Sequence, residues 1–229
     1  MKLDISDAVR EGFHSTFTDR GIVFIGIFFL INILSTFVGV SVMNNMQMFP
    51  TPYFYHMVYT QIPRLSWSIF QLALGLASIV ATIAALRSFV EDKKIDQDLF
   101  ERRIGIATLN FIIGSIAFGL LVAFGLVFFI IPGIFIFVSL IMWTVYISVE
   151  DENFIEAMGS SWDMVKGDRL RLFALGIVVI LIEAAVSIVL GLPALVFSNA
   201  ATVLVSQVTA AFGTVFGISI LAEAYNQLK

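Results

Sequence analysis

Long stretches without a charged residue alternate with short charged segments, and this alternation limits the fold of the chain more than any motif. The 46 residues from Ile104 to Val149 contain no Asp, Glu, Lys or Arg. Over the whole chain 59% of residues are hydrophobic, 13% are charged, and the mean hydropathy is +0.97. A soluble domain is roughly half apolar and a quarter charged. The pattern therefore predicts helices that cross a bilayer, because backbone amides in hydrocarbon must pair within their own helix.

About 20 apolar residues are needed to cross the hydrocarbon core. On this scale the sequence predicts six spans, which run approximately over Ile22–Met43, Ser66–Phe89, Ile104–Phe129, Ile131–Val149, Leu172–Leu190 and Phe197–Leu221. Pro132 and Gly133 interrupt the longest apolar block and predict a tight hairpin there, and Pro193 predicts another. The expected fold is an all-α membrane bundle of six transmembrane helices in three hairpins, forming a single domain over residues 1–229.

The basic residues predict the orientation. With the N-terminus inside, Arg64 is the only one of 13 basic residues on the outer side. This distribution follows the positive-inside rule. Merging the third and fourth spans would move Lys166, Arg169, Arg171 and Lys229 to the wrong side. We therefore expect a multi-pass protein of the cell membrane with both termini in the cytoplasm.

Composition also excludes some kinds of site and partner. The chain has no cysteine, which excludes disulfides and thiolate metal ligands. The formal net charge of -4 argues against nucleic acid as a partner. The first 20 residues are polar and of mixed charge, so a cleaved signal peptide is not expected.

Two segments on the expected cytoplasmic side have an amphipathic pattern. In residues 153–167 an apolar stripe from Phe154 to Val165 predicts a helix that lies in the headgroup plane. Asn153 is placed to cap its start and Gly167 to end it. Residues 4–20 carry a comparable stripe.

A weak internal repeat accompanies these segments. Val90-Glu91-Asp92, Val149-Glu150-Asp151 and Ala222-Glu223-Ala224 follow the second, fourth and sixth spans. The pattern suggests three units, each an interfacial segment followed by a hairpin, that start near residues 4, 95 and 153.

Glu183 is the one ionisable residue deep inside a predicted span, where a charge costs at least about 2.5 kcal/mol by insertion scales. It is therefore the first candidate for a transport or proton-relay site. The alternative is structural: a protonated carboxyl, or one hydrogen-bonded to the sixth span. The further candidates for an intramembrane polar site are Asn32, Gln71, Asn110, Asn199 and Gln207.

Other chemistry has little support in the sequence. The outer loop of residues 44–65 contains Met46, Met48, Met57 and His56, which would suit copper. Methionine is also a common gap filler, and aromatic residues are expected at a membrane interface. No phosphate-binding glycine loop, zinc-binding histidine pair or nucleophile elbow occurs, so we expect no enzymatic activity, no catalytic residue, no metal and no cofactor.

The segment from Glu156 to Gly167 includes Ser161, Trp162 and Lys166, and Arg169 and a new apolar span follow it. With the Pro132-Gly133 hairpin, it resembles a group of uncharacterised prokaryotic six-span proteins, similar to the membrane domain attached to some glycerophosphodiester phosphodiesterases. The similarity is best over Ile131–Leu181. The acidic, cysteine-free composition resembles haloarchaeal members. The phosphodiesterase activity of such enzymes belongs to a separate soluble barrel, so the resemblance carries over no catalytic residue.

These observations favour a non-enzymatic membrane scaffold or accessory module that serves a partner protein or a lipid process. Membrane lipids, and either a protein partner or a second copy of the chain, are its expected contacts. The alternative is a small permease or channel that uses Glu183 and the intramembrane amides.

Overall fold

The computed structural model of the chain describes residues 3–45, 64–96, 98–192 and 199–229, with the backbone alone for residues 37–45, 64–67, 199 and 200. Within these ranges all regular secondary structure is helical, and there is no β-strand. The helices are α1 (Ile5–Thr16), α2 (Asp19–Asn45), α4 (Arg64–Val90), α5 (Asp98–Glu101), α6 (Ile104–Phe128), α7 (Ile130–Leu140), α8 (Trp143–Val149), α9 (Phe154–Met164), α10 (Arg169–Gly191) and α11 (Asn199–Leu228).

In the described part of the chain these helices form six spans that are long and apolar enough to cross a membrane, which confirms the all-α fold class. They are α2, α4, α6, α7 together with α8, α10 and α11. In α6 and α10 only 11% of the spanning residues are buried within the protein. Their apolar exteriors therefore face the surroundings, as lipid-exposed helices do.

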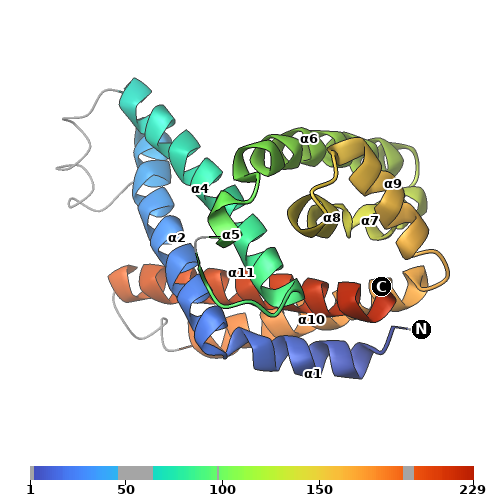
Figure 1. Cartoon of the computed structure of the whole chain (residues 1–229). Helices are drawn as coiled ribbons and strands as arrows, with labels where there is room; N and C mark the ends of the chain where they lie inside the picture. Colours follow the sequence, from blue (N-terminus) through green and yellow to red (C-terminus); the bar gives the residue numbers. More distant parts are fainter. Residues whose placement is uncertain (1–2, 46–63, 97, 193–198) are drawn as a thin grey trace.

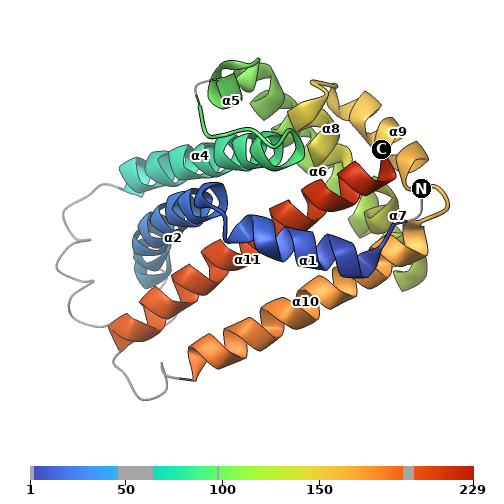
Figure 2. The ribbon, with the colours of Figure 1, turned by 60° about the horizontal axis from the view of Figure 1, so that its bottom comes forward.

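The spans form three hairpins, α2 with α4, α6 with α7 and α8, and α10 with α11. Figure 1 shows the hairpins diverging: the turn between α6 and α7 and the outer end of α10 and α11 lie on opposite sides of the view. At the opposite side the end of α4 contacts the end of α8, which contacts the end of α11. The two termini lie side by side (Figures 1 and 2), and the Asp4 amide donates to the Gln227 side chain at 2.9 Å. We call this end, with α1, α5, α9 and residues 90–96 and 149–153, the base.

The turn of the second hairpin is at Phe129 rather than at Pro132. Phe129 has an extended backbone (φ -159°, ψ 138°) between α6 and α7. Pro132 lies in the first turn of α7, where its missing N–H costs no helical hydrogen bond. The two helices approach closely at Gly125 and Gly133, since a Cβ on Gly125 would lie 2.8 Å from the Cα of Gly133. The apolar block is therefore divided as expected, three residues earlier.

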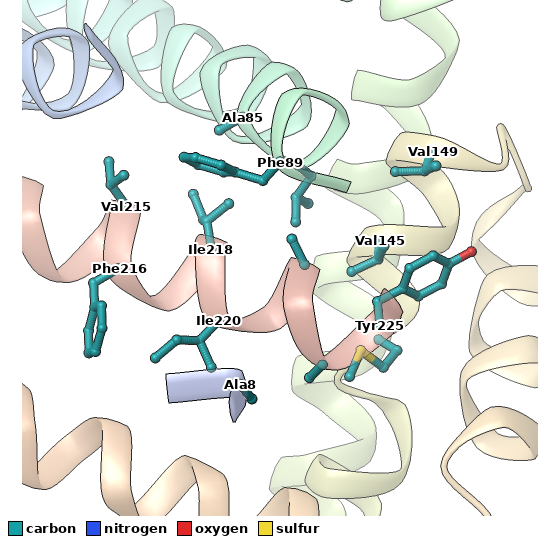
Figure 3. Close-up of a cluster of buried hydrophobic side chains, with 14 of the residues drawn as sticks. Ala8, Ala85, Phe89, Val145, Val149, Val215, Phe216, Ile218, Ile220 and Tyr225 are labelled. Atoms are coloured by element: carbon teal, nitrogen blue, oxygen red, sulfur yellow. The ribbon is translucent and has the colours of Figure 1, made fainter. Parts of the chain in front are cut away.

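Helix α11 is the centre of the core (Figure 3). Its side chains pack against Ala85 and Phe89 of α4 and against Val145 and Val149 of α8. On another side Ile220 lies next to α1. One helix thus contacts elements from all three hairpins.

The segments that precede the three hairpins lie at the base. Each packs against a different hairpin from the one that it leads into: α5 and α9 pack against the preceding hairpin, and α1 packs against the last one. Helix α1 precedes the first hairpin and contacts α10 and α11 of the third, as Figure 2 shows. The single turn α5 precedes the second hairpin and contacts α4 of the first. Helix α9 precedes the third hairpin and contacts α6, α7 and α8 of the second. This exchange links the three units into one body.

Two glycines of α6 make close helix contacts, and they lie apart from the small residues on its exposed face. Ser115, Gly119 and Ala123 of α6 are exposed. Instead the buried Gly114 receives the ring of Trp143, and Gly125 receives α7. Because neighbouring helix positions differ by about 100°, Gly114 and Ser115 lie on different faces of α6.

Candidate functional site

An arginine at the base is almost completely buried. Arg87, in the last turn of α4, has a side chain that is 1% exposed. Its Nε donates to the Ser148 carbonyl at 2.6 Å and its Nη1 to the Leu99 carbonyl at 2.9 Å. Its Nη2 donates to Asp151 Oδ1 at 3.3 Å. All three guanidinium nitrogens are satisfied, and Arg87 joins the first hairpin to the second and to α5.

Asp151 accepts from a second arginine as well. Arg102 Nε donates to Asp151 Oδ2 at 3.0 Å, and Arg102 Nη1 donates to Glu91 Oε1 at 2.9 Å. Partial burial acts to lower the pKa of Arg102, but the hydrogen bonds and charges of Asp151 and Glu91 outweigh it and raise this pKa. The guanidinium therefore stays charged, and Glu91 is drawn into the network of Arg87, Arg102 and Asp151.

The same arrangement occurs in the first unit of the repeat. Arg20, at the start of the first hairpin, donates to Asp92 Oδ1 at 2.5 Å, just as Arg102 donates to Asp151 in the second. Asp92 and Asp151 both have a left-handed backbone, with φ of 51° and 56°. In the third unit Ala224 stands at the corresponding position. The pair of an arginine and a left-handed aspartate thus recurs in the first two units, and the third unit lacks the carboxylate.

The C-terminus is held to the base by Glu150. The Tyr225 hydroxyl donates to Glu150 Oε1 at 2.7 Å, and Lys229 Nζ donates to the same oxygen at 2.5 Å. The hydrogen bonds from Lys229 and Tyr225 hold the pKa of Glu150 below its ordinary value of 4.5. This contact ties α11 of the third hairpin to the end of the second.

A cavity of about 360 Å³, lined mostly by charged residues, opens beside this network. It is lined by three basic and three acidic residues and a leucine, namely Arg87, Lys93, Arg102, Glu91, Asp98, Glu101 and Leu99. The charges balance, and both arginines already donate to protein oxygens. The cavity walls hold no histidine, serine or threonine to serve in an acid–base or nucleophilic step.

The polar residues predicted for the spans do not converge. Glu183 is half-buried against α11, where a Cβ on Gly213 would lie 3.5 Å from its carboxyl. Gln71 is exposed and Asn32 half-buried, on different helices. Asn110 borders a small pocket near the base with Arg103 and Asp151. The side chain of Asn199 and the copper candidates Met46, Met48, His56 and Met57 lie outside the described part of the chain. Between the five candidates whose side chains are described, no hydrogen bond forms.

A hydrogen bond from Glu183 to Gln207, one of the structural alternatives for the sixth span, does not form. Gln207 Nε2 instead contacts its neighbour Ser206 at 3.4 Å. The register of α10 and α11 places Glu183 opposite Gly213 and Gly217. Gln207 lies six residues, or about 9 Å, further along the helix axis.

The motif around α9 has a structural basis that the sequence did not reveal. Ser161 Oγ donates to the Ser139 carbonyl and accepts from the Met142 amide, both at 3.1 Å. These two backbone groups flank the break between α7 and α8, where helical pairing is interrupted. Asn153 caps α9 as expected by accepting from the amides of Ile155 and Glu156 at 3.1 and 3.0 Å.

The remaining members of the motif are exposed. Gly167 has φ 103° and follows the end of α9, as predicted. Trp162 packs edge-on against Phe135 with ring centroids 5.5 Å apart. Glu156 and Lys166 are exposed.

Sequence reasoning missed Arg87 and Asp151 as the centre of the base. Arg87 counted only toward the orientation of the spans, and Asp151 only toward the repeat. The recurrence of Glu-Asp after two spans was the available signal, because it marks the two left-handed turns that hold the paired carboxylates.

A family model for a domain of unknown function, DUF7847, matches residues 3–228. The chain belongs to the DUF7847 family. The match spans all three hairpins and the base, so the DUF7847 unit is the whole described bundle. Searches of curated proteins and of solved structures found no match to this DUF7847 chain.

Proposed function

We propose that this chain is a non-enzymatic accessory module of the cell membrane, with its base and both termini in the cytoplasm and the base presented to a partner protein. The six apolar helices support its place in the membrane. The basic residues support the orientation, since they gather on the side of the termini.

The observation that carries the proposal is the pairing of charged groups between hairpins at the base. Arg87 with Asp151, Arg102 with Glu91, and Glu150 with Lys229 each join different parts of the chain. Groups held in this way contribute to a fixed surface. Around them lie exposed carboxylates, Asp96, Asp98 and Glu101 on the α5 side and Asp7 and Glu11 on α1. Exposed basic residues lie among them, Lys94 and Arg103 near α5 and Arg10 on α1, so the base offers both charges to a partner.

Crosslinking and pull-down from native membranes tests this function. We expect one defined protein to be recovered with the parent chain in an amount comparable to the bait. If the partner binds at α5, the double variant Asp98→Arg and Glu101→Arg should abolish its recovery. If the partner binds at α1, the double variant Asp7→Arg and Glu11→Arg should do so. Recovery of the bare chain from parent membranes would contradict the proposal.

A permease is the second candidate, and the environment of Glu183 favours it. Its carboxyl packs against the glycines of α11, and no described residue hydrogen-bonds it. A carboxyl without a partner at this depth is a candidate ion or proton site. Reconstituted vesicles should then show ion or proton flux that Glu183→Gln removes. Equal flux with the parent and with empty vesicles would contradict a permease.

The resemblance to the membrane domain of glycerophosphodiester phosphodiesterases and to haloarchaeal proteins remains a prediction from the sequence. It supports a role beside lipid metabolism without an active site of its own. Lipids are the expected small-molecule contacts, and nucleic acid is not an expected partner.

A further inference from the structure

An apolar groove of about 250 Å³ runs between the second and third hairpins. Ile134 and Phe137 of α7 form one wall, and Phe173, Ile177 and Gly176 of α10 form the other. Almost all of its lining surface is carbon. It opens between spans whose outer faces are lipid-exposed, so its natural content is an acyl chain rather than water.

Arg169 is not part of the groove wall but begins the same helix, α10. It precedes Phe173 by one helical turn on the same face of α10. Its guanidinium carbon lies 4.7 Å from the centroid of Phe135 and 4.4 Å from that of Trp162. The two aromatic rings hold the guanidinium in place by cation–π contact.

The guanidinium is only partly satisfied. Its Nη2 donates to the Trp162 carbonyl at 3.2 Å, while its Nε is buried and has no hydrogen-bond partner. A buried N–H without a partner is rare and calls for an acceptor. The nearby carboxylate of Asp168 is occupied by Arg171 at 3.2 Å. Lys166 adds a further exposed positive charge three residues before Arg169.

We propose that this groove is a binding site for an anionic phospholipid, with one acyl chain between α7 and α10 and the phosphate on Arg169. Each half of the site matches one half of the ligand: carbon walls for the chain, and a positioned guanidinium for the phosphate oxygens. Trp162 lies where interfacial tryptophans are enriched in membrane proteins. The inference rests on the chain lying in a bilayer and not on the partner role, so a failed pull-down leaves it intact.

Native mass spectrometry of the delipidated full chain in detergent tests the site, with phosphatidylglycerol and phosphatidylcholine of identical acyl chains as probes. We expect phosphatidylglycerol to be retained in preference. Arg169→Gln should weaken its retention about tenfold, the effect of losing one charge-assisted hydrogen bond. Arg10→Gln, on the exposed side of α1, removes the same charge away from the groove and should leave retention unchanged.

The groove is tested separately by Gly176→Leu. A Cβ at Gly176 meets no atom within 4 Å, so the larger side chain fills the groove without disturbing the fold. It should reduce retention of both lipids, whereas Gly75→Leu, on an equally open part of α4, should not. Equal retention of the two lipids by the parent, parent-like retention by Gly176→Leu, or equal competition by inorganic phosphate would overturn the proposal.

Discussion

Arg87 of α4 donates to Asp151, 64 residues later in the chain, and both groups lie at the point where the first and second hairpins meet. The side chains are 1% and 17% exposed. Since Arg102 binds the other oxygen of the same carboxylate, Asp151 balances two arginines from different elements. The base is therefore held by charge as well as by the apolar contacts of α11, and breaking one member leaves buried charges without a partner.

Replacing Arg87 with methionine should lower the free energy of unfolding by about 3–5 kcal/mol, the usual result of removing one partner of a buried ion pair. The carbonyls of Ser148 and Leu99 would also lose their donor. Denaturation by SDS in mixed micelles measures the change. Arg10→Met removes an exposed arginine and should shift the midpoint by less than about 0.5 kcal/mol. Equal midpoints for the two variants would show that Arg87 is not structural.

The two left-handed aspartates should respond unequally to Asn, which also tolerates this backbone. Asp151→Asn should cost about 2 kcal/mol or more, because it leaves Arg87 buried without a charge partner. Asp92→Asn should cost about 0–1 kcal/mol, because Asp92 is 88% exposed in its pair with Arg20. The same SDS titration compares them, and a larger effect at Asp92 would contradict the assignment.

Close packing of the second hairpin predicts a difference between two glycines. A Cβ at Gly133 would lie 2.7 Å from the backbone nitrogen of Leu126, so Gly133→Ala should destabilise by about 1–3 kcal/mol. A Cβ at Gly119 meets nothing within 4 Å. Gly119→Ala should therefore be neutral or stabilise by up to about 1 kcal/mol. Thermal unfolding in detergent distinguishes them, and similar effects at both sites would argue against the close turn at Phe129.

Stability should depend on pH through Glu150, whose pKa is lowered by Lys229 and Tyr225. A lowered pKa in the folded state contributes stability above the ordinary value of 4.5, and this contribution is lost as the pH falls through the folded value. Glu150→Gln should therefore lose less stability than the parent between pH 6 and pH 3. Melting temperatures across this range measure it, with the exposed Asp7→Asn as the control. Identical acid sensitivity of the parent and Glu150→Gln would show that Glu150 does not contribute to the pH dependence of stability.

The sequence was sufficient for the fold class because span length and backbone pairing depend on local composition. The α9 cap at Asn153 and the left-handed Gly167 were predicted for the same reason. The contacts of Arg87, Ser161 and Arg169 were not predictable, because each reaches a partner on another helix and depends on helix phase. The contacts of Glu183 likewise depend on how α10 and α11 are aligned, which places its carboxyl next to glycines rather than next to Gln207.

Single-cysteine labelling tests the central claim most directly, because the parent chain has no cysteine and gives no background. Cysteines at Asp7, Asp98 and Asp163 report on the exposed base, and one at Thr51 reports on the loop that the sequence places outside. In intact cells a membrane-impermeant maleimide should label only the cysteine at Thr51. The three base positions should react only after the membrane is permeabilised. Labelling of any base cysteine in intact cells would contradict six spans with a cytoplasmic base.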